Sequence, residues 1–196
     1  MMIKKSLKKN IFIAICGSAF VGKGFVKNYL KKKFSFEEPP VYTTRKKRKN
    51  ENRDERIFLT EEKFQKKIKE GELILPHKIY GNYYGFPKDA FDSSKYQITE
   101  IHVKNLLKFR KILPSALVIA ILPKDINFLF ERAERRKKDS KENEKEIQLR
   151  LHSAEKEIKK TLQLKEYLNY IYYVDQKNEN SICKQIEDYI KSFFNL

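Results

Sequence analysis

The feature that most constrains this chain is one glycine-rich segment, Gly17-Ser18-Ala19-Phe20-Val21-Gly22-Lys23-Gly24. It follows an apolar run at 11–16 and precedes a helical pattern that begins near Val26. Glycines between a strand and a helix let backbone N–H groups converge on an anion, and the helix N-terminus adds partial positive charge. The sequence therefore predicts a phosphate-binding loop, with a glycine-rich turn on a core strand as the alternative.

The lysine of this loop has an expected role, but its usual neighbour is missing. Lys23 is placed to reach the β- and γ-phosphates of a nucleotide. The Ser or Thr that usually follows this lysine and binds Mg²⁺ is replaced by Gly24, and Phe25 comes next. Neither position supplies a hydroxyl.

The charge of the chain suits an anionic partner without identifying one. The 196 residues include 43 Lys and Arg against 26 Asp and Glu, a formal net charge of +17. Lysine is spread over nearly every segment and no recognition motif accompanies it, so dedicated nucleic-acid binding is not expected. Cys16 and Cys183 lie far apart and predict reduced, packed thiols. The apolar runs are shorter than a membrane span, and we expect a soluble, cytoplasmic protein.

Apolar runs alternate with helical patterns, which predicts an α/β fold with a mainly parallel sheet. The continuous run at 117–122 is typical of a parallel strand that is buried on both faces. Other strands are expected at 11–16, 41–44, 57–59, 96–103 and 170–174. Helices are expected after the glycine loop, between Thr60 as N-cap and Gly71, after Asp125, over 147–162 and over 182–193.

Three further segments carry candidate functional side chains. Alternation along the strand expected at 96–103 places Glu100 and His102 on one face. The arginines Arg45, Arg48, Arg53 and Arg56 form either a solvated loop or, for the first two, a fork pair that converges on a phosphate. Tyr83 and Tyr84 fall in a tight turn expected at 81–85 and either pack or bind a phosphate through a phenol. The polar stretch 139–146 is expected to remain unpacked and mobile.

Four motifs together resemble the guanylate kinase family. They are Gly17-x-x-x-x-Gly22-Lys23, Thr43-Thr44-Arg45-x-x-Arg48, Gly81-Asn82-Tyr83-Tyr84-Gly85 and Arg150-x-x-x-Ala154-x-x-Glu157. The resemblance covers nearly the whole chain, and the middle two motifs are more specific than the glycine loop. It implies a P-loop three-layer sandwich with about five parallel strands in a core (1–38, 97–130 and 147–196). It also implies an inserted monophosphate-binding lobe (39–96) and a lid (131–146).

The resemblance implies that the chain is an ATP-dependent nucleoside monophosphate kinase, with GMP as the default acceptor and Mg²⁺ accompanying ATP. Residues 17–24 would hold the ATP phosphates, with Lys23 on the transferred group. The acceptor phosphate would be bound by Arg45, Arg48 and Tyr84. The lid arginines would be Arg132, Arg136 and Arg150, with Arg135 as the alternative to Arg136. Such a set suits phosphoryl transfer, which depends on positioning and charge neutralisation.

The positions that would read guanine depart from the family pattern. Groups that accept or donate hydrogen bonds in the family are replaced here by Val41, Leu75, Phe86 and His102. A buried guanine N–H group without an acceptor costs about 1–3 kcal/mol. Glu100 is the candidate for a substitute carboxylate.

Three hypotheses follow from these matches and departures. The first is a kinase acting on GMP. The second is a divergent relative that phosphorylates another nucleotide or a small phosphate ester, as the replaced base contacts suggest. The third is a weakened nucleotide-binding or scaffold module; the missing hydroxyls at Gly24 and Phe25 favour it, and the retained lysine and arginines oppose it.

Overall fold

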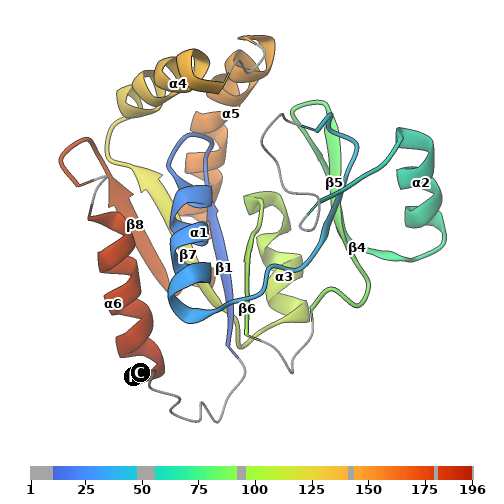
Figure 1. The fold of residues 1–196 in the computed structure, drawn as a ribbon, viewed down its shortest axis with the longest axis horizontal. Helices are drawn as coiled ribbons and strands as arrows, with labels where there is room; N and C mark the ends of the chain where they lie inside the picture. The colour runs from blue at the N-terminus through green and yellow to red at the C-terminus, as the bar shows by residue number, and fades with distance from the viewer. Residues whose placement is uncertain (1–10, 48–55, 92–95, 141–143, 179–180, 196) are drawn as a thin grey trace.

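The computed structural model describes residues 11–47, 56–91, 96–140, 144–178 and 181–195 (Figure 1). Its elements follow in the order β1 (Phe12–Gly17), α1 (Lys23–Phe34), β2 (Val41–Thr43), β3 (Arg56–Phe58), α2 (Glu61–Lys69), β4 (Leu73–Ile79), β5 (Asn82–Pro87), β6 (Gln97–Glu100), η1 (Val103–Asn105), α3 (Leu106–Ile112), β7 (Leu117–Pro123), α4 (Asn127–Ser140), α5 (Glu144–Gln163), η2 (Lys165–Tyr167), β8 (Tyr170–Val174) and α6 (Ile182–Phe194). None of the helices in these ranges is both long and apolar enough to cross a membrane.

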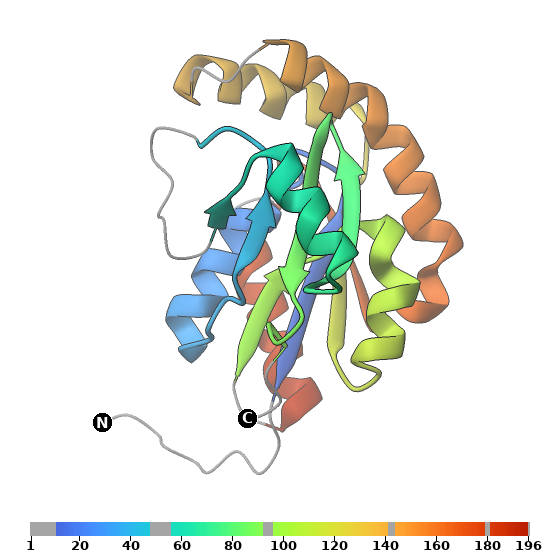
Figure 2. The ribbon, with the colours of Figure 1, turned by 90° about the vertical axis from the view of Figure 1, so that its right-hand side faces the viewer.

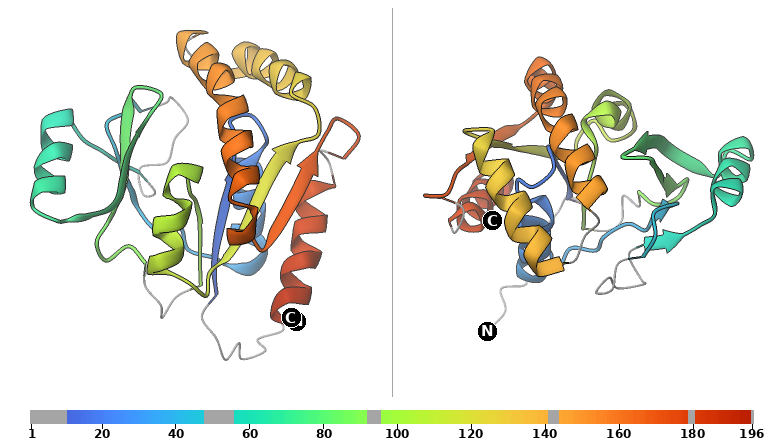
Figure 3. Two further views of the ribbon diagram at one scale, coloured as in Figure 1. Left: turned by 180° about the vertical axis from the view of Figure 1, so that it is seen from behind. Right: turned by 90° about the horizontal axis from the view of Figure 1, so that it is seen from above.

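The main sheet has the strand order β6-β1-β7-β8, and its strands are all parallel. Helices α1 and α6 cover one face, and α3 and α5 cover the other (Figures 1 and 3). The expected α/β fold is therefore confirmed. Within the described residues this sheet has four strands, whereas the family resemblance implied about five.

The two faces of the main sheet belong to two hydrophobic clusters because side chains alternate along a strand. Ile13 and Ile15 pack in the cluster that includes the apolar residues of α1 and α6. Ala14 and Cys16 pack in the cluster that includes α3. Burial on both faces explains why strand β7 reads as a continuous apolar run.

A second sheet, β3-β2-β5-β4, is formed by the chain between α1 and β6. It stands beside the main sheet on the side of β6, with α2 on its outer face (Figures 1 and 2). Phe64 of α2 is fully buried and its ring lies 5.5 Å from that of Tyr83. The expected cap of α2 is present, since Thr60 Oγ1 accepts from the Lys63 N–H at 3.3 Å.

Two of the expected local structures are wrong. The strand expected at 96–103 ends at Glu100, because His102 Nδ1 accepts from the Lys104 N–H at 3.2 Å and starts η1. Glu100 and His102 therefore do not share one strand face. The turn expected at 81–85 lies one residue earlier, at Tyr80 and Gly81, which both have positive φ. The two tyrosines after it belong to strand β5.

The polar stretch 139–146 lies only partly within the described residues: residues 139 and 140 end helix α4, and residues 144–146 begin helix α5. Charge pairing joins the two helices at this point: Lys137 Nζ lies 2.6 Å from Glu144 Oε1. Exposed charged side chains are thus compatible with regular helix on both sides of the connection.

Candidate functional site

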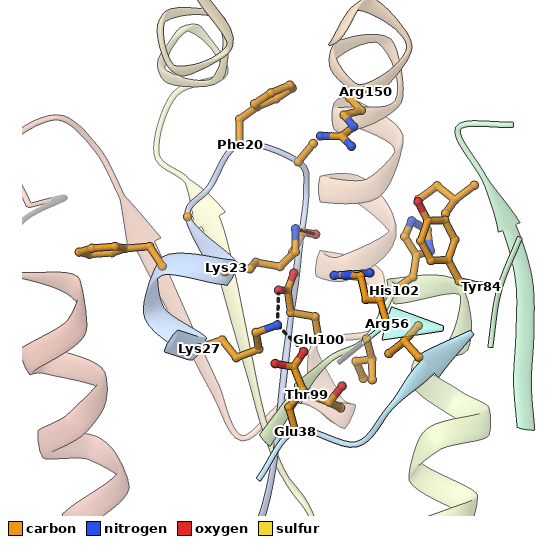
Figure 4. Close-up of a pocket in the computed structure, with 18 of the residues that line it drawn as sticks. Phe20, Lys23, Lys27, Glu38, Arg56, Tyr84, Thr99, Glu100, His102 and Arg150 are labelled. Atoms are coloured by element: carbon orange, nitrogen blue, oxygen red, sulfur yellow. Dashed lines mark hydrogen bonds and ion pairs between the residues drawn. The ribbon is translucent and has the colours of Figure 1, made fainter. Parts of the chain in front are cut away.

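A cavity of about 1070 Å³ lies where the carboxyl ends of the main-sheet strands meet the second sheet and helices α4 and α5. Its walls come from the glycine loop, α1, β4, β5, β6 and the two long helices above them (Figure 4). The carboxyl edge of a parallel sheet is where α/β proteins usually bind ligands. Most of the site residues predicted from the sequence line this cavity.

The glycine loop begins with a close approach between strands. Gly17 has φ +140, and a Cβ placed on it would lie 2.1 Å from the carbonyl oxygen of Ile121 on the neighbouring strand. Any side chain at this position would therefore clash with β7. Gly22 has φ +92 and stands immediately before α1, which starts at Lys23. Ser18 and Val21 are buried and do not line the cavity, whereas Ala19 and Phe20 do.

Lys23 is turned back onto the loop that precedes it. Its Nζ donates to the carbonyl oxygens of Gly17 at 3.0 Å and Ser18 at 2.6 Å. Burial lowers the pKa of Lys23, and the carboxylates of Glu100 and Glu157 partly oppose that shift. A bound phosphate would offer this ammonium a stronger, charged acceptor than two carbonyls.

Helices α4 and α5 bring arginines to the upper wall of the cavity. Arg132 reaches over the loop: a Cβ placed on Gly22 would lie 3.7 Å from its Nη2. Arg135 and Arg136 both line the cavity. Arg150 of α5 lies above the loop in Figure 4 and forms an ion pair with Glu146. Its Cζ lies 5.6 Å from the Tyr80 ring centroid. Four cations thus surround one end of the cavity.

The second sheet brings Arg45 and Tyr84 to the opposite wall. Arg45 is only 6% exposed, and its Nη1 donates to the Lys46 carbonyl oxygen at 2.7 Å. The adjacent threonines connect the two family motifs: Thr43 pairs with Tyr84 across the sheet, and Thr44 Oγ1 accepts from the Tyr83 N–H at 2.9 Å. Arg48 and Arg53 lie outside the described residues.

The four positions that depart from the family pattern gather in the same cavity. Its lining includes Val41, Leu75, Phe86 and His102. Three of them are apolar and less than 10% exposed. These four positions therefore share one cavity, and the wall that they form is mostly apolar.

Several polar residues of this wall were not assigned a role from the sequence. The His77 ring stacks between those of Tyr84 and His102, with centroids 5.7 and 5.6 Å away. Burial lowers the pKa of His77 to about 4. The hydrogen bond to the Leu75 carbonyl partly opposes this shift, and the nearby His102 adds to it. Its imidazole is therefore neutral at pH 7. A histidine in a β-prone run gives no sequence signal for this position.

Glu157 also reaches the cavity, two helical turns after Arg150 on α5. Tyr80 donates its hydroxyl to Glu157 Oε1 at 2.6 Å, and His102 Nε2 lies 3.4 Å from the same oxygen. Burial and the Glu157 charge raise the pKa of Tyr80. The seven-residue spacing in the motif was the signal for this residue, because it places both side chains on one helix face.

Lys27, Glu38 and Arg56 are further lining residues without a role assigned from the sequence. Lys27 forms ion pairs with Glu38 and with Glu100, the latter at 3.3 Å. Glu100, the proposed base-reading carboxylate, is therefore engaged on the α1 side of the cavity. The sequence predicted that Glu100 and His102 share one strand face, and the structure shows that they do not.

Comparisons with known proteins agree with one another. A family model described as guanylate kinase matches residues 9–193. A curated guanylate kinase of Lactobacillus johnsonii is 32% identical over 191 residues, which cover 94% of this chain and 87% of the relative. A guanylate kinase of Clostridium acetobutylicum is 35% identical over 156 residues, covering 77% and 73%.

A solved structure gives the same result for the fold. The crystal structure of guanylate kinase from Anaplasma phagocytophilum superposes with a TM-score of 0.65 at 19% identity, covering 94% of this chain and 86% of that one. At this identity the likeness concerns the fold alone.

Proposed function

The chain belongs to the guanylate kinase family, and we propose that it transfers the γ-phosphoryl group of ATP to GMP, giving ADP and GDP. One observation carries the proposal. A glycine loop with its lysine faces a buried arginine and a tyrosine across one cavity, and arginines from α4 and α5 line the space above them. This arrangement suits two phosphate groups brought together from opposite sides.

On the donor side, residues 17–24 bind the ATP phosphates through backbone N–H groups and the N-terminus of α1. Lys23 exchanges its two carbonyl acceptors for phosphate oxygens when the nucleotide binds. Because burial lowers the pKa of this lysine, the gain of an anionic partner stabilises its charged form.

On the acceptor side, Arg45 and Tyr84 bind the phosphate of GMP, together with Arg48. The planar guanidinium of Arg45 offers paired N–H donors that match phosphate oxygens. An oxygen of that phosphate attacks the γ-phosphorus, and the bond from this phosphorus to the β–γ bridging oxygen breaks. ADP leaves with the electron pair of that bond.

The arginines Arg132, Arg136 and Arg150 neutralise the charge that builds up on the transferred group. We propose that 131–146 acts as a lid over the core (1–38, 97–130 and 147–196), while the lobe at 39–96 carries the acceptor. Closure would remove water, which otherwise competes with GMP for the phosphoryl group.

The side chains present do not fit a metal held by the usual P-loop route, which uses a hydroxyl after the lysine and an acidic residue on a nearby strand. Gly24 and Phe25 have no hydroxyl, and the carboxylate near Gly24, that of Glu100, is paired with Lys27. Mg²⁺ would accompany ATP as its counterion, and these side chains would not hold it by the usual route.

A second acceptor class is favoured by one observation, the mostly apolar wall formed by Val41, Leu75 and Phe86. A base with fewer N–H donors than guanine would leave fewer donors without acceptors against this wall, so its binding would lose less free energy. Neutral His77 and the Glu157 carboxylate supply acceptors on the same wall, which is why GMP remains the first choice. We also propose a cytoplasmic location, where both buried free thiols remain reduced.

The test is ADP formation from ATP and GMP by the purified full chain, compared with Lys23→Met. We expect turnover by the wild type and a loss of about 10²–10³-fold in the variant. Lys66→Met, on the exposed face of α2, is the control for removing a lysine charge and should retain full activity. Equal turnover in Lys23→Met would remove the glycine loop from the reaction. ATP binding without transfer to any monophosphate would favour the binding module.

A further inference from the structure

Helix α1 carries a second lysine into the cavity, one turn after the lysine of the glycine loop. Lys23 and Lys27 are four residues apart, so both side chains leave the helix on the same face. Figure 4 shows Lys27 pointing toward Glu100, whereas Lys23 reaches back to the backbone of the glycine loop. Lys27 is only 5% exposed, which is rare for lysine unless its charge is paired.

The partners of Lys27 are two carboxylates from different parts of the chain. Its Nζ contacts Glu38, just before β2, and lies 3.3 Å from Oε1 of Glu100 at the end of β6. The Glu38 side chain is 4% exposed. The ammonium therefore lies between one buried and one partly buried carboxylate in the wall of the cavity.

The same Glu100 oxygen faces the residue that follows the loop lysine. A Cβ placed on Gly24 would lie 3.6 Å from Glu100 Oε1. A Ser or Thr at this position would direct its hydroxyl toward that carboxylate, and such a pair is how P-loop enzymes hold Mg²⁺. In this chain the hydroxyl is absent, and a lysine ammonium contacts the carboxylate oxygen.

The charges of this cluster persist at neutral pH. Burial by itself would raise the pKa of Glu100, but Lys27, Lys23 and Arg56 together lower it to about 2. Burial by itself would lower the pKa of Lys27, but Glu100 and Glu38 together raise it. The Lys27 ammonium and the Glu100 carboxylate therefore both stay charged at neutral pH.

We propose that Lys27 is a built-in cation that replaces a protein-bound Mg²⁺ in this site, so that the nucleotide is bound with little help from the metal. This inference rests on the proposed function, because it requires ATP or ADP to bind in this cavity. In this role Lys27 compensates the charge of Glu100 and does not react itself. Gly24, which stands where P-loop enzymes have a Ser or Thr, is the second departure that the proposal explains.

A purely structural role is the competing explanation, since Lys27 also ties α1 to the segment before β2. The two roles differ in the metal dependence of nucleotide binding. If Lys27 only stabilises the fold, its removal lowers stability without altering the effect of Mg²⁺ on affinity. If it stands in for the metal, its removal changes that effect.

The test is calorimetric titration of ADP into the full chain, once with excess Mg²⁺ and once with EDTA. For the wild type we expect the two dissociation constants to agree within about threefold, because Mg²⁺ and the protein are barely coupled. In the double variant Gly24→Ser/Lys27→Met, a hydroxyl faces a freed carboxylate, and we expect Mg²⁺ to tighten ADP binding by at least about fivefold.

Two single variants serve as controls. Lys27→Met should weaken ADP binding in EDTA more than in Mg²⁺. Lys31→Met removes a lysine of the same helix that lies 3.2 Å from Glu38, and should leave the ratio of dissociation constants as in the wild type. Thermal unfolding of each variant shows whether it is folded at the titration temperature.

The outcomes separate the two levels of the account. Strong Mg²⁺ dependence in the wild type that is unchanged in Lys27→Met would overturn the role of Lys27 and leave the proposed function intact. No ADP binding by the folded wild type, with or without Mg²⁺, would overturn the proposed function itself.

Discussion

The two halves of the cavity differ in how they are built. The half proposed to bind phosphates, here called the phosphate half, combines a backbone loop with cations: Lys23, Arg132 and Arg150 on one side and Arg45 on the other. The half proposed to bind the base, here called the base half, is mostly apolar and contains the stacked rings of His77 and His102. The difference is physical: any phosphate demands positive charge and N–H donors, whereas a planar base can be read by several side-chain sets.

The largest expected effect is on the phosphate half, at Arg150. Replacement by Met removes a cation above the glycine loop, and we expect kcat with GMP to fall by about 10³-fold. Arg150→Lys keeps the positive charge but loses the paired N–H donors of the guanidinium, so we expect a smaller fall in kcat. Steady-state kinetics measure both, and a kcat of Arg150→Met near that of the wild type would remove this arginine from phosphoryl transfer.

The next effect separates the donor from the acceptor within the phosphate half. Arg45→Met should raise KM for GMP by about 10–100-fold, because charge-assisted hydrogen bonds to the acceptor phosphate are lost. KM for ATP should stay close to the wild-type value. Tyr84→Phe, which removes one hydroxyl, should shift KM for GMP in the same direction by less. A rise in KM for ATP alone would place Arg45 on the donor side.

A pH effect on stability is expected from the base half. The unfolded chain takes up a proton near the ordinary histidine pKa of 6.5, whereas His77 in the folded protein resists protonation down to about pH 4. Acidification from pH 7 to 5 therefore favours the unfolded state, by roughly 2 kcal/mol from this residue. Denaturant unfolding at the two pH values measures it.

His77→Gln should make the unfolding free energy less dependent on pH over that interval. His152→Gln, on the exposed side of α5, is the matched control and should retain the wild-type dependence. If both variants behave like the wild type, His77 does not hold its neutral form in the folded protein as described.

The smallest expected effect comes from adding acidic side chains to the base half. The double substitution Leu75→Glu/His102→Asp supplies two carboxylates to the base half and should raise kcat/KM for GMP by about tenfold, with little change for AMP. Leu75 has φ +53, a left-handed conformation that a non-glycine residue already adopts here. Its replacement by Glu therefore leaves the backbone requirement of this position unchanged. An equal gain with both monophosphates would mean that these positions do not face the base.

The same contrast explains what the sequence could predict. The glycine loop, the alternation of apolar runs and the caps of α2 are local patterns, and local physics was enough to predict them. The buried strand at β7 was predicted for the same reason. Lys23 and Arg45, the side chains proposed to bind phosphate, stand in such patterns, and both line the cavity.

The remaining features depend on contacts between distant segments. The position of His77 between Tyr84 and His102 depends on three separate elements, and Lys27 meets Glu38 and Glu100 only after α1 packs against β6. The strand expected to reach residue 103 ends at Glu100 because His102 caps a 3-10 turn instead. Alternation of residue types does not distinguish these cases.

We propose that a kinase site that keeps the lysine and arginines of its phosphate half selects GMP through an altered base half. The most direct measurement is kcat/KM of the wild type with ATP and each of GMP, dGMP, AMP, CMP, UMP and dTMP, assayed by ADP formation. The account predicts selective turnover of GMP. Preference for another acceptor in this panel would contradict it.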